Sequence, residues 1–387
     1  MAKVVEHIEA RLRGSRLREG RAELRIAEIA PPWVRVPPDL YGGIEWIISI
    51  LADGLIERGH DVTLYATGDS RTKARLRGTF KQPVSMGGKG FYDLIHPMAT
   101  QTIPAFLEAD RYDIIHDHTG PIAVCLGTLS DTPVLHTLHG PFNPDVQQFL
   151  RMVGDKIYFN SISDAQRSGC PELPYVGTIY NAVEVETYPF RSEKEDYALF
   201  LGRFSEDKGA HNAIYIAQQA GIPLRMAGKV DAGVDADYFK EHIEPHVDGE
   251  NIVYEGEVDG EQKRELLAGA RFLLFPIQWE EPFGLVMTEA LACGTPVVAT
   301  AMGAVPEIVE DGEVGILAGA GELDALVAAI KDGRVDDVDP RRCREHVHQH
   351  FGVEAMLDGY ESAFEKILSN GRGSRTREEA AFRSRVK

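Results

Sequence analysis

The segment 272–299 restricts the fold of this chain more than any other, because it reads as strand, loop, helix and strand in immediate succession. Phe272 to Pro276 is a short apolar run, as in a buried strand. Gly284 to Ala292 is rich in good helix formers and ends before Gly294, and Val297 to Ala299 begins the next strand. Such a unit predicts a parallel α/β sheet, in which ligands gather where strand carboxyl ends meet helix amino ends.

Two glutamates lie at different depths in this unit. Glu281 falls just before the helix and Glu289 about one and a half turns inside it, so the two carboxylates can serve different purposes. The amides of the first turn, Phe283 to Val286, lie at the positive end of the helix dipole and suit a phosphate or a sugar hydroxyl oxygen. A diphosphate-linked sugar fits both features. A helix-capping Glu281 and a solvated Glu289 are the structural alternatives.

The stretch Trp279 to Val298, WEEPFGLVMTEALACGTPVV, resembles the signature of retaining glycosyltransferases of family 4. The similarity extends over residues 24–368, and PPDLYGGIE and GDSRT are most similar to the branch of avilamycin-type and tetrahydrobiopterin glucosyltransferases. The resemblance implies the GT-B fold, in which two Rossmann-like parallel-sheet domains face each other across a cleft. It also implies transfer of a sugar from a nucleotide diphosphate, with UDP-glucose as the expected donor, retention of anomeric configuration and no metal ion or other cofactor.

A chain of 387 residues is too long for one ordinary core and fits two α/β domains. We predict an N-terminal acceptor domain at 23–184, a nucleotide-sugar domain at 185–354, and a closing helix at 355–370 that crosses back to the first domain. The basic ends, 1–22 and 371–387, are expected to be a flexible extension and a disordered tail.

The first β-loop-α-β unit carries a glycine pair. Gly42 and Gly43 open its helix, and the lack of side chains there would let a phosphate or a sugar approach the backbone. A simple turn is the alternative, but the surrounding YGGIE also resembles the N-terminal domain of the family. Residues 69–92 show little periodicity and are expected to be loops, and Asn181 to Val183 match the interdomain switch, with Ala182 where the family commonly has glycine.

Four histidines lie at the ends of two predicted strands, Asp113 to Asp117 and Val134 to Leu138. They are His116, His118, His136 and His139. We assign them no metal site, because no nearby cysteine or fixed carboxylate completes one. A structural histidine is the simplest interpretation of His116, His136 and His139. His118 matches the second histidine of the family's H-x-H motif, and the resemblance implies that its side chain reaches the transferring sugar.

Arg203 and Lys208, in GRFSEDKGA, lie where a predicted strand leads into a helix. A planar guanidinium and a compact ammonium beside glycine backbone can hold a diphosphate without a metal ion. Surface ion pairs with Glu206 or Asp207 are the alternative. The resemblance favours the diphosphate.

The remaining donor contacts also follow from the resemblance. It places the backbone at Gly228 and Val258 against the nucleotide base and gives Glu289 the ribose hydroxyls. The sugar ring is assigned to Glu281 together with the amides of Phe283, Gly284 and Leu285.

Composition excludes several other classes. The net charge is −19, and both ends are basic, so the folded body is more acidic still and nucleic acid is not expected as a partner. Neither a G-x-G-x-x-G fingerprint nor a phosphate-loop motif occurs. The scattered Cys125, Cys170, Cys293 and Cys343 fit a reducing cytoplasm, and no apolar run is long enough to span a bilayer.

Other readings of the same motifs stay open. A nucleotide-sugar epimerase of the same fold, or a sugar-nucleotide-binding protein without catalysis, would carry similar residues. A membrane contact through residues 1–22, which would make the acceptor a lipid, is not favoured. The acceptor and the oligomeric state are not specified by the sequence.

Overall fold

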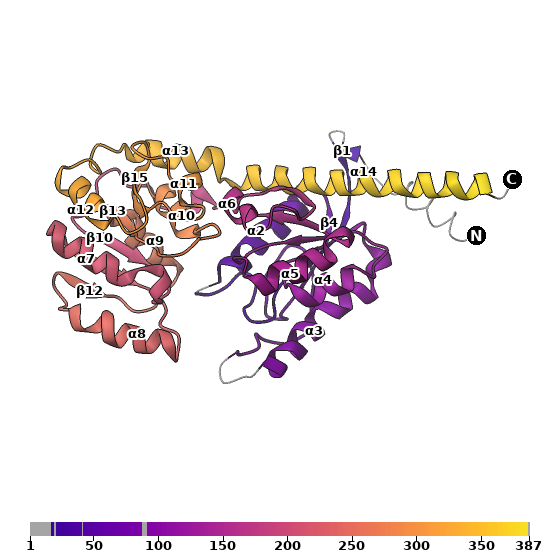
Figure 1. Ribbon diagram of the computed structural model, residues 1–387, viewed down its shortest axis with the longest axis horizontal. Coiled ribbons are helices and arrows are strands. Elements are labelled where there is room, and N and C mark those ends of the chain that lie inside the picture. Colours follow the sequence, from indigo (N-terminus) through magenta and orange to yellow (C-terminus); the bar gives the residue numbers. More distant parts are fainter. Residues whose placement is uncertain (1–16, 19–20, 41, 87–90, 386–387) are drawn as a thin grey trace.

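Two parallel sheets form the framework of the computed structural model, which describes residues 17–18, 21–40, 42–86 and 91–385 (Figure 1). Among these residues the first sheet has seven strands in the order β5-β4-β3-β6-β7-β8-β9, and the second has six in the order β12-β11-β10-β13-β14-β15. Neighbouring strands are parallel throughout both sheets. The predicted GT-B type architecture is therefore confirmed.

The N-terminal domain contains the seven-stranded sheet. In chain order its strands are β3 (Arg25–Ile29), β4 (Asp61–Ala66), β5 (Arg75–Gly78), β6 (Ile114–Asp117), β7 (Val134–Thr137), β8 (Tyr158–Ser161) and β9 (Tyr175–Thr178). Its helices are α2 (Gly43–Glu57), α3 (Phe91–Leu107), α4 (Pro121–Gly127), α5 (Pro144–Val153) and α6 (Asp164–Ser168). Helices alternate with strands because each parallel connection must cross over one face of the sheet.

The C-terminal domain repeats this plan. Its strands are β10 (Ala198–Leu201), β11 (Leu224–Ala227), β12 (Ile252–Tyr254), β13 (Phe272–Phe275), β14 (Val297–Thr300) and β15 (Gly315–Ala318). Its helices are α7 (Ala210–Ala220), α8 (Val234–His242), α9 (Gly260–Gly269), α10 (Leu285–Ala292), α11 (Val305–Ile308), α12 (Leu323–Lys331) and α13 (Pro340–His350). Apolar clusters fill both faces of this sheet, as expected for strands buried on two sides.

The last helix, α14 (Val353–Arg385), leaves the C-terminal domain and runs along the N-terminal one (Figure 1). Leu357, Tyr360 and Phe364 are buried in the core that α2 and β3 also share. A Cβ atom on Gly54 of α2 would lie 2.7 Å from Leu357 Cδ1, so the two helices approach closely at a glycine. Arg58 adds hydrogen bonds of 2.7 Å to carboxylates of this helix. These contacts attach the end of the second domain to the first.

The chain crosses between the domains twice, at neighbouring places. Val183 forms a parallel bridge with Gly352, and its N–H donates to the Phe351 carbonyl at 3.0 Å. The segment predicted to be the interdomain switch thus lies beside the start of α14.

A second link joins the domains. Glu307 of α11 accepts hydrogen bonds from the amides of Asp164 and Ala165 at 2.8 and 2.6 Å, and from the Tyr180 hydroxyl at 2.9 Å. A carboxylate of the C-terminal domain therefore caps a short helix of the N-terminal domain.

Three predicted loop or tail segments differ in the structure. Within 69–92, Arg75–Gly78 forms the edge strand β5, whose mostly exposed arginines hide the usual apolar alternation. Helix α14 extends to Arg385 and so includes most of the segment expected to be a tail. Of the extension 1–22, Leu17–Arg18 and Arg21–Ala22 pair as β1 and β2, and the rest lies outside the described residues.

Candidate active site

Lys208 and Glu281 form a largely buried ion pair in the C-terminal domain. The ammonium lies 2.5 Å from Glu281 Oε2 and 4.4 Å from the centre of the Trp279 ring. The same carboxylate oxygen accepts the Trp279 indole N–H at 3.0 Å. Gly209, at φ 72°, follows the lysine, and a Cβ atom there would lie 2.0 Å from the Pro276 carbonyl oxygen. The loops after β10 and β13 are therefore packed directly against each other.

Arg203, just after β10, has weaker contacts with the protein than Lys208 has. Its side chain is 40% exposed, and its ion pairs with Asp207 and Asp235 are long, at 3.8 and 3.7 Å. Its Nε donates to Ser205 Oγ at 3.3 Å. The surface pairing considered from the sequence is present for Asp207, but its contribution is small at this exposure. The guanidinium can therefore turn to an anion at little cost.

Two helix N-termini without side-chain caps meet at the domain boundary. α10 begins after Gly284, at φ 85°, and α2 begins after Gly42, and neither glycine has a side chain that could cap the first turn. A Cβ atom on Gly43 would lie 3.2 Å from Leu285 Cδ1, so the two helix starts are neighbours. Their amides and dipoles both favour anionic or hydroxyl oxygens. The structure thus brings together the glycine pair and the α10 amides predicted for the site.

The side chain of Phe283, the residue before this helix start, is buried. It lies in an aromatic cluster with Tyr180 and Phe351, at ring distances of 6.2 and 6.0 Å. The residues that cross between the domains therefore pack against the start of α10.

One carboxylate oxygen of Glu289 already accepts hydrogen bonds from other residues of the protein. Its Oε1 accepts the Tyr188 hydroxyl at 2.8 Å and the Lys263 ammonium at 2.6 Å. Within the described part of the chain, no hydrogen bond reaches Oε2. The carboxylate is thus oriented through one oxygen, and the other can accept from a ligand hydroxyl.

Gly228 lies where β10 and β11 end side by side. A Cβ atom there would lie 1.8 Å from the Gly202 carbonyl oxygen, so only glycine fits. Its amide donates to the Gly256 carbonyl at 2.9 Å, and its carbonyl accepts the Tyr254 hydroxyl at 3.1 Å. Val258, the other residue expected at the base, is half-buried against the C-terminal core.

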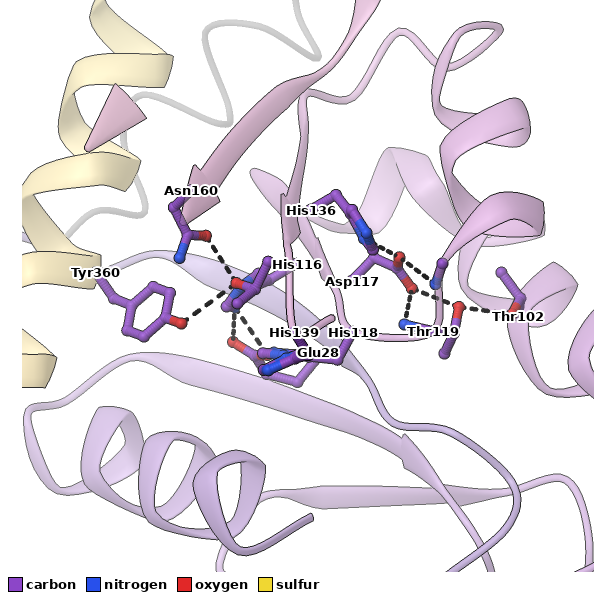
Figure 2. A network of polar contacts seen from close by, with 12 residues as sticks. Glu28, Thr102, His116, Asp117, His118, Thr119, His136, His139, Asn160 and Tyr360 are labelled. Atoms are coloured by element: carbon purple, nitrogen blue, oxygen red, sulfur yellow. Dashed lines mark hydrogen bonds and ion pairs between the residues drawn. The ribbon is translucent and has the colours of Figure 1, made fainter. Parts of the chain in front are cut away.

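In the N-terminal domain, the histidines are organised by a carboxylate (Figure 2). Glu28 on β3 is fully buried and lies opposite His116 in the sheet register. Its carboxylate lies 3.0 Å from His116 Nδ1 and 3.2 Å from His118 Nε2. Burial raises the pKa of Glu28, while the hydrogen bond with His118 opposes that rise. Burial lowers the pKa of His116 to about 3 and that of His118 to about 4, so both imidazoles are neutral.

His118, which the resemblance assigns to the sugar, lies beside Glu28 in this network (Figure 2). Its side chain is fully buried, and both ring nitrogens are engaged, because Nδ1 lies 2.8 Å from His139 Nε2. His139 is half-buried and stacks on His118 at 5.1 Å between ring centres. Burial, together with the nearby histidines, lowers the pKa of His139 well below its ordinary value. The imidazole at the outer end of this row is therefore His139.

Asp117 and His136 form a separate pair on the opposite face of the same strands (Figure 2). His136 Nδ1 lies 2.6 Å from Asp117 Oδ2, and the other Asp117 oxygen accepts from the amide and hydroxyl of Thr119. Burial would raise the pKa of Asp117, but these hydrogen bonds hold it below its ordinary value. Alternate residues of a strand point to opposite faces, which separates this pair from Glu28.

The only described group with the spacing of a metal site is Glu28, His116 and His118, whose ligand atoms lie within 4.8 Å of one another. The contacts of Glu28 with the two histidines have the lengths of direct hydrogen bonds. We interpret the group as a hydrogen-bonded network.

Sequence reasoning missed Glu28, Tyr188, Lys263 and Trp279. Glu28 had a signal, since a charged residue interrupts the apolar strand RIAEI. Tyr188 and Lys263 carry no local mark of their roles, because they meet Glu289 through the tertiary fold, and the role of Trp279 depends on Lys208, which is distant in the chain.

Two Rossmann-like domains whose helix starts at Gly43 and Leu285 are neighbours have the architecture of a GT-B type protein. The family described as "Glycosyl transferases group 1" matches residues 187–349, and "Glycosyltransferase Family 4" matches residues 41–170. Together these matches span most of the chain. The protein belongs to glycosyltransferase family 4 and is a hexosyltransferase.

Individual relatives agree with this assignment. AviGT4, a glycosyltransferase involved in avilamycin A biosynthesis, is 27% identical with a TM-score of 0.65, over 90% of this chain and 98% of its own. The phosphatidyl-myo-inositol mannosyltransferase of Mycolicibacterium smegmatis is 25% identical over 84% of this chain and 90% of its own. Anabaena HepE, solved with UDP and glucose, shares the fold with a TM-score of 0.68 at 20% identity, over 89% of this chain and 100% of its own.

No helix among the described residues has both the length and the apolar character needed to cross a membrane.

Proposed function

We propose that this protein is a retaining, metal-independent glucosyltransferase that moves glucose from UDP-glucose to a small-molecule or glycan acceptor. The observation that carries the proposal is the meeting of the uncapped α2 and α10 starts at Gly43 and Leu285. Because helix N-termini favour anions and hydroxyl oxygens, an anionic, hydroxyl-rich ligand suits this place. The choice of donor is supported by the complex of HepE with UDP and glucose and by the similarity to AviGT4.

Arg203 and Lys208 act on the leaving diphosphate in this proposal. Charge develops on the diphosphate as the sugar leaves, and preorganised cations stabilise that charge. Lys208 is already held by Glu281 at 2.5 Å, so its position is set before the ligand arrives. Arg203 is held only by long contacts and can close on the ligand afterwards.

The sugar and ribose lie on either side of this diphosphate. Glu281 and the amides of Phe283 to Leu285 bind the sugar, while Glu289 Oε2 accepts from the ribose hydroxyls. From the N-terminal domain, His118 reaches the sugar as the resemblance implies, and His139, 2.8 Å from it, lies beside this contact.

Thermal unfolding against a panel of UDP, GDP and ADP and their sugars tests the donor assignment, because a ligand that binds only the native state raises the melting temperature. We expect a selective rise with UDP and UDP-glucose that is lost in Arg203→Ala and Lys208→Ala. A rise with GDP or ADP sugars alone would keep the fold and change the donor. A protein that responds to none of them would contradict the transferase proposal.

Product analysis without acceptor separates the transferase from an epimerase of the same fold. A transferase consumes UDP-glucose only slowly, by transfer to water, and releases UDP. Conversion of UDP-glucose to another UDP-sugar would instead show an epimerase.

A further inference from the structure

A buried carboxyl group lies at the start of α2, beside the place where the two helix starts meet. Glu45, in the first turn of this helix, is only 6% exposed. Its Oε2 lies 3.1 Å from the position that a Cβ atom on Gly42 would occupy. The next residue, Gly43, is the one that approaches Leu285 of α10. The carboxyl group of Glu45 therefore lies against the glycine next to the contact between the two domains.

Glu45 has no partner residue in the described part of the chain. The hydrogen bond that acts on its carboxyl group comes from its own backbone N–H. Buried polar side chains are almost always hydrogen-bonded to other groups, so one that lacks a partner residue calls for an explanation. A ligand at the start of α2 provides one, because the same helix start is the proposed diphosphate site.

The charged groups on the elements around α2 have partners of their own. At its start these groups are Arg35 and Asp39 in the preceding loop, Glu28 on β3, His118 after β6, Asp69 after β4, and Lys208 and Glu281 across the domain boundary. At its other end, carboxylates of α14 pair with Arg58. Burial raises the pKa of Glu45 to about 7 and its own amide opposes the rise, with no contribution from these charges.

A diphosphate at the start of α2 must favour the protonated form of Glu45 further. A nearby anion disfavours an ionised carboxylate. The ionised carboxylate also competes with phosphate oxygens for the positive end of the helix dipole. A protonated carboxyl group carries no charge against the ligand, and its O–H can donate to a phosphate oxygen. Above pH 7, where most of the free protein lacks this proton, binding must therefore draw one from solvent.

We propose that Glu45 couples donor binding to proton uptake: when a nucleotide diphosphate binds at the starts of α2 and α10, the Glu45 carboxylate takes up one proton from solvent. The ligand in this statement rests on the proposed function, whereas the buried carboxyl group belongs to the protein alone. No covalent bond to the ligand forms. The proton adds to a carboxylate oxygen and returns to solvent when the nucleotide leaves.

Titration calorimetry in buffers of different ionisation enthalpy counts the protons taken up on binding. The probe is the UDP-, GDP- or ADP-glucose that raises the melting temperature of the wild type, since the diphosphate of a nucleotide sugar does not itself titrate near neutral pH. We expect uptake of about half a proton or more per bound molecule at pH 8. By the same linkage, Kd should rise by up to about tenfold per pH unit above pH 7.

Glu45→Gln decides whether this residue takes up the proton. The glutamine amide is uncharged at every pH and has nearly the shape of a protonated carboxyl group. The variant should therefore bind at pH 8 about as tightly as at pH 6 and take up no proton. Glu57→Gln, which changes an exposed carboxylate of the same helix, is the matched control and should keep the wild-type uptake.

An uptake that persists in Glu45→Gln would overturn the proposal. It would assign the proton to another group that titrates in this range, such as Lys194, whose pKa burial lowers to about 8.

The outcomes also separate this coupling from the donor assignment. Binding of UDP-glucose without proton uptake would overturn the coupling and leave the glucosyltransferase proposal standing. Uptake with GDP- or ADP-glucose alone, lost in Glu45→Gln, would support the coupling and change the donor. A wild-type protein that binds none of the three would overturn both, because the coupling requires a diphosphate at this site.

Discussion

Lys208 Nζ lies 2.5 Å from Glu281 Oε2, although 73 residues separate them in the chain. One residue follows β10 and the other follows β13, and these two strands are neighbours in the parallel sheet. The pair therefore ties the predicted diphosphate cation to the predicted sugar carboxylate before any ligand binds.

Removal of the lysine should destabilise the protein as well as its complex with UDP. In Lys208→Met the buried Glu281 charge loses its partner, which costs about 1–3 kcal/mol of the free energy of unfolding. Urea unfolding measures the loss. The control is Lys73→Met, whose pairing with Glu57 is exposed and should contribute less than about 1 kcal/mol. Equal losses in the two variants would show that the burial of the Lys208 pair has no energetic consequence.

Glu289 should make the protein prefer nucleotides that carry both ribose hydroxyls. If its free Oε2 accepts from ribose hydroxyls, wild type binds UDP more tightly than 2′-deoxy-UDP, and Glu289→Gln removes most of that preference. A hydrogen bond to a charged group contributes about 1.5–3 kcal/mol, or roughly 10- to 150-fold in Kd. Calorimetry with both nucleotides measures the ratio. Glu265→Gln, an exposed carboxylate on α9, should keep the wild-type ratio, and a Glu289→Gln protein that does the same would contradict the ribose assignment.

Glu45 should make stability fall as pH rises toward neutrality. It lies buried in the first turn of α2, and burial raises its pKa to about 7. The folded state favours the protonated carboxyl, so this contribution to stability is fully present below the unfolded-state pKa, near 4.5. It is lost as pH rises through the folded-state pKa of about 7, where the buried carboxyl ionises. Glu45→Gln should therefore stabilise the protein at pH 8 relative to wild type by on the order of 2 kcal/mol, with little difference at pH 4.

Free energies of unfolding at a series of pH values give this comparison. Glu57→Gln, in the same helix but exposed, should follow the wild-type curve. A Glu45→Gln curve parallel to wild type from pH 4 to pH 8 would show that Glu45 does not titrate with folding.

Glu307 should hold the two domains together. Its carboxylate accepts from two α6 amides and the Tyr180 hydroxyl, so Glu307→Ala leaves these donors without their interdomain partner. We expect a larger radius of gyration in small-angle X-ray scattering and weaker UDP-glucose binding by about tenfold, because the open form must first close. Glu313→Ala, a half-exposed carboxylate of the same domain, is the control. An unchanged radius in Glu307→Ala would exclude this role.

The strands and helices that carry the site were accessible to sequence reasoning. Phe272–Phe275, Leu285–Ala292 and Val297–Thr300 fall within a residue or two of the predicted segments, because apolar periodicity, glycine and proline act locally. The edge strand β5 was missed since it pairs on one side only and exposes its arginines, so it lacks that pattern.

Which histidine faces outward could be decided only by the tertiary structure. His118 matches the family motif, yet its ring is enclosed because Glu28, 90 residues earlier, lies within hydrogen-bond distance of it. Parallel pairing of β3 with β6 and the packing of Tyr360 from α14 beside His116 create this enclosure. Neither of these two contacts can be recognised from the residues next to His118 in the sequence. The residue types and their spacing along the chain therefore identify the candidate histidines. The burial of each ring and the placement of its proton depend on contacts between segments that are distant in the chain.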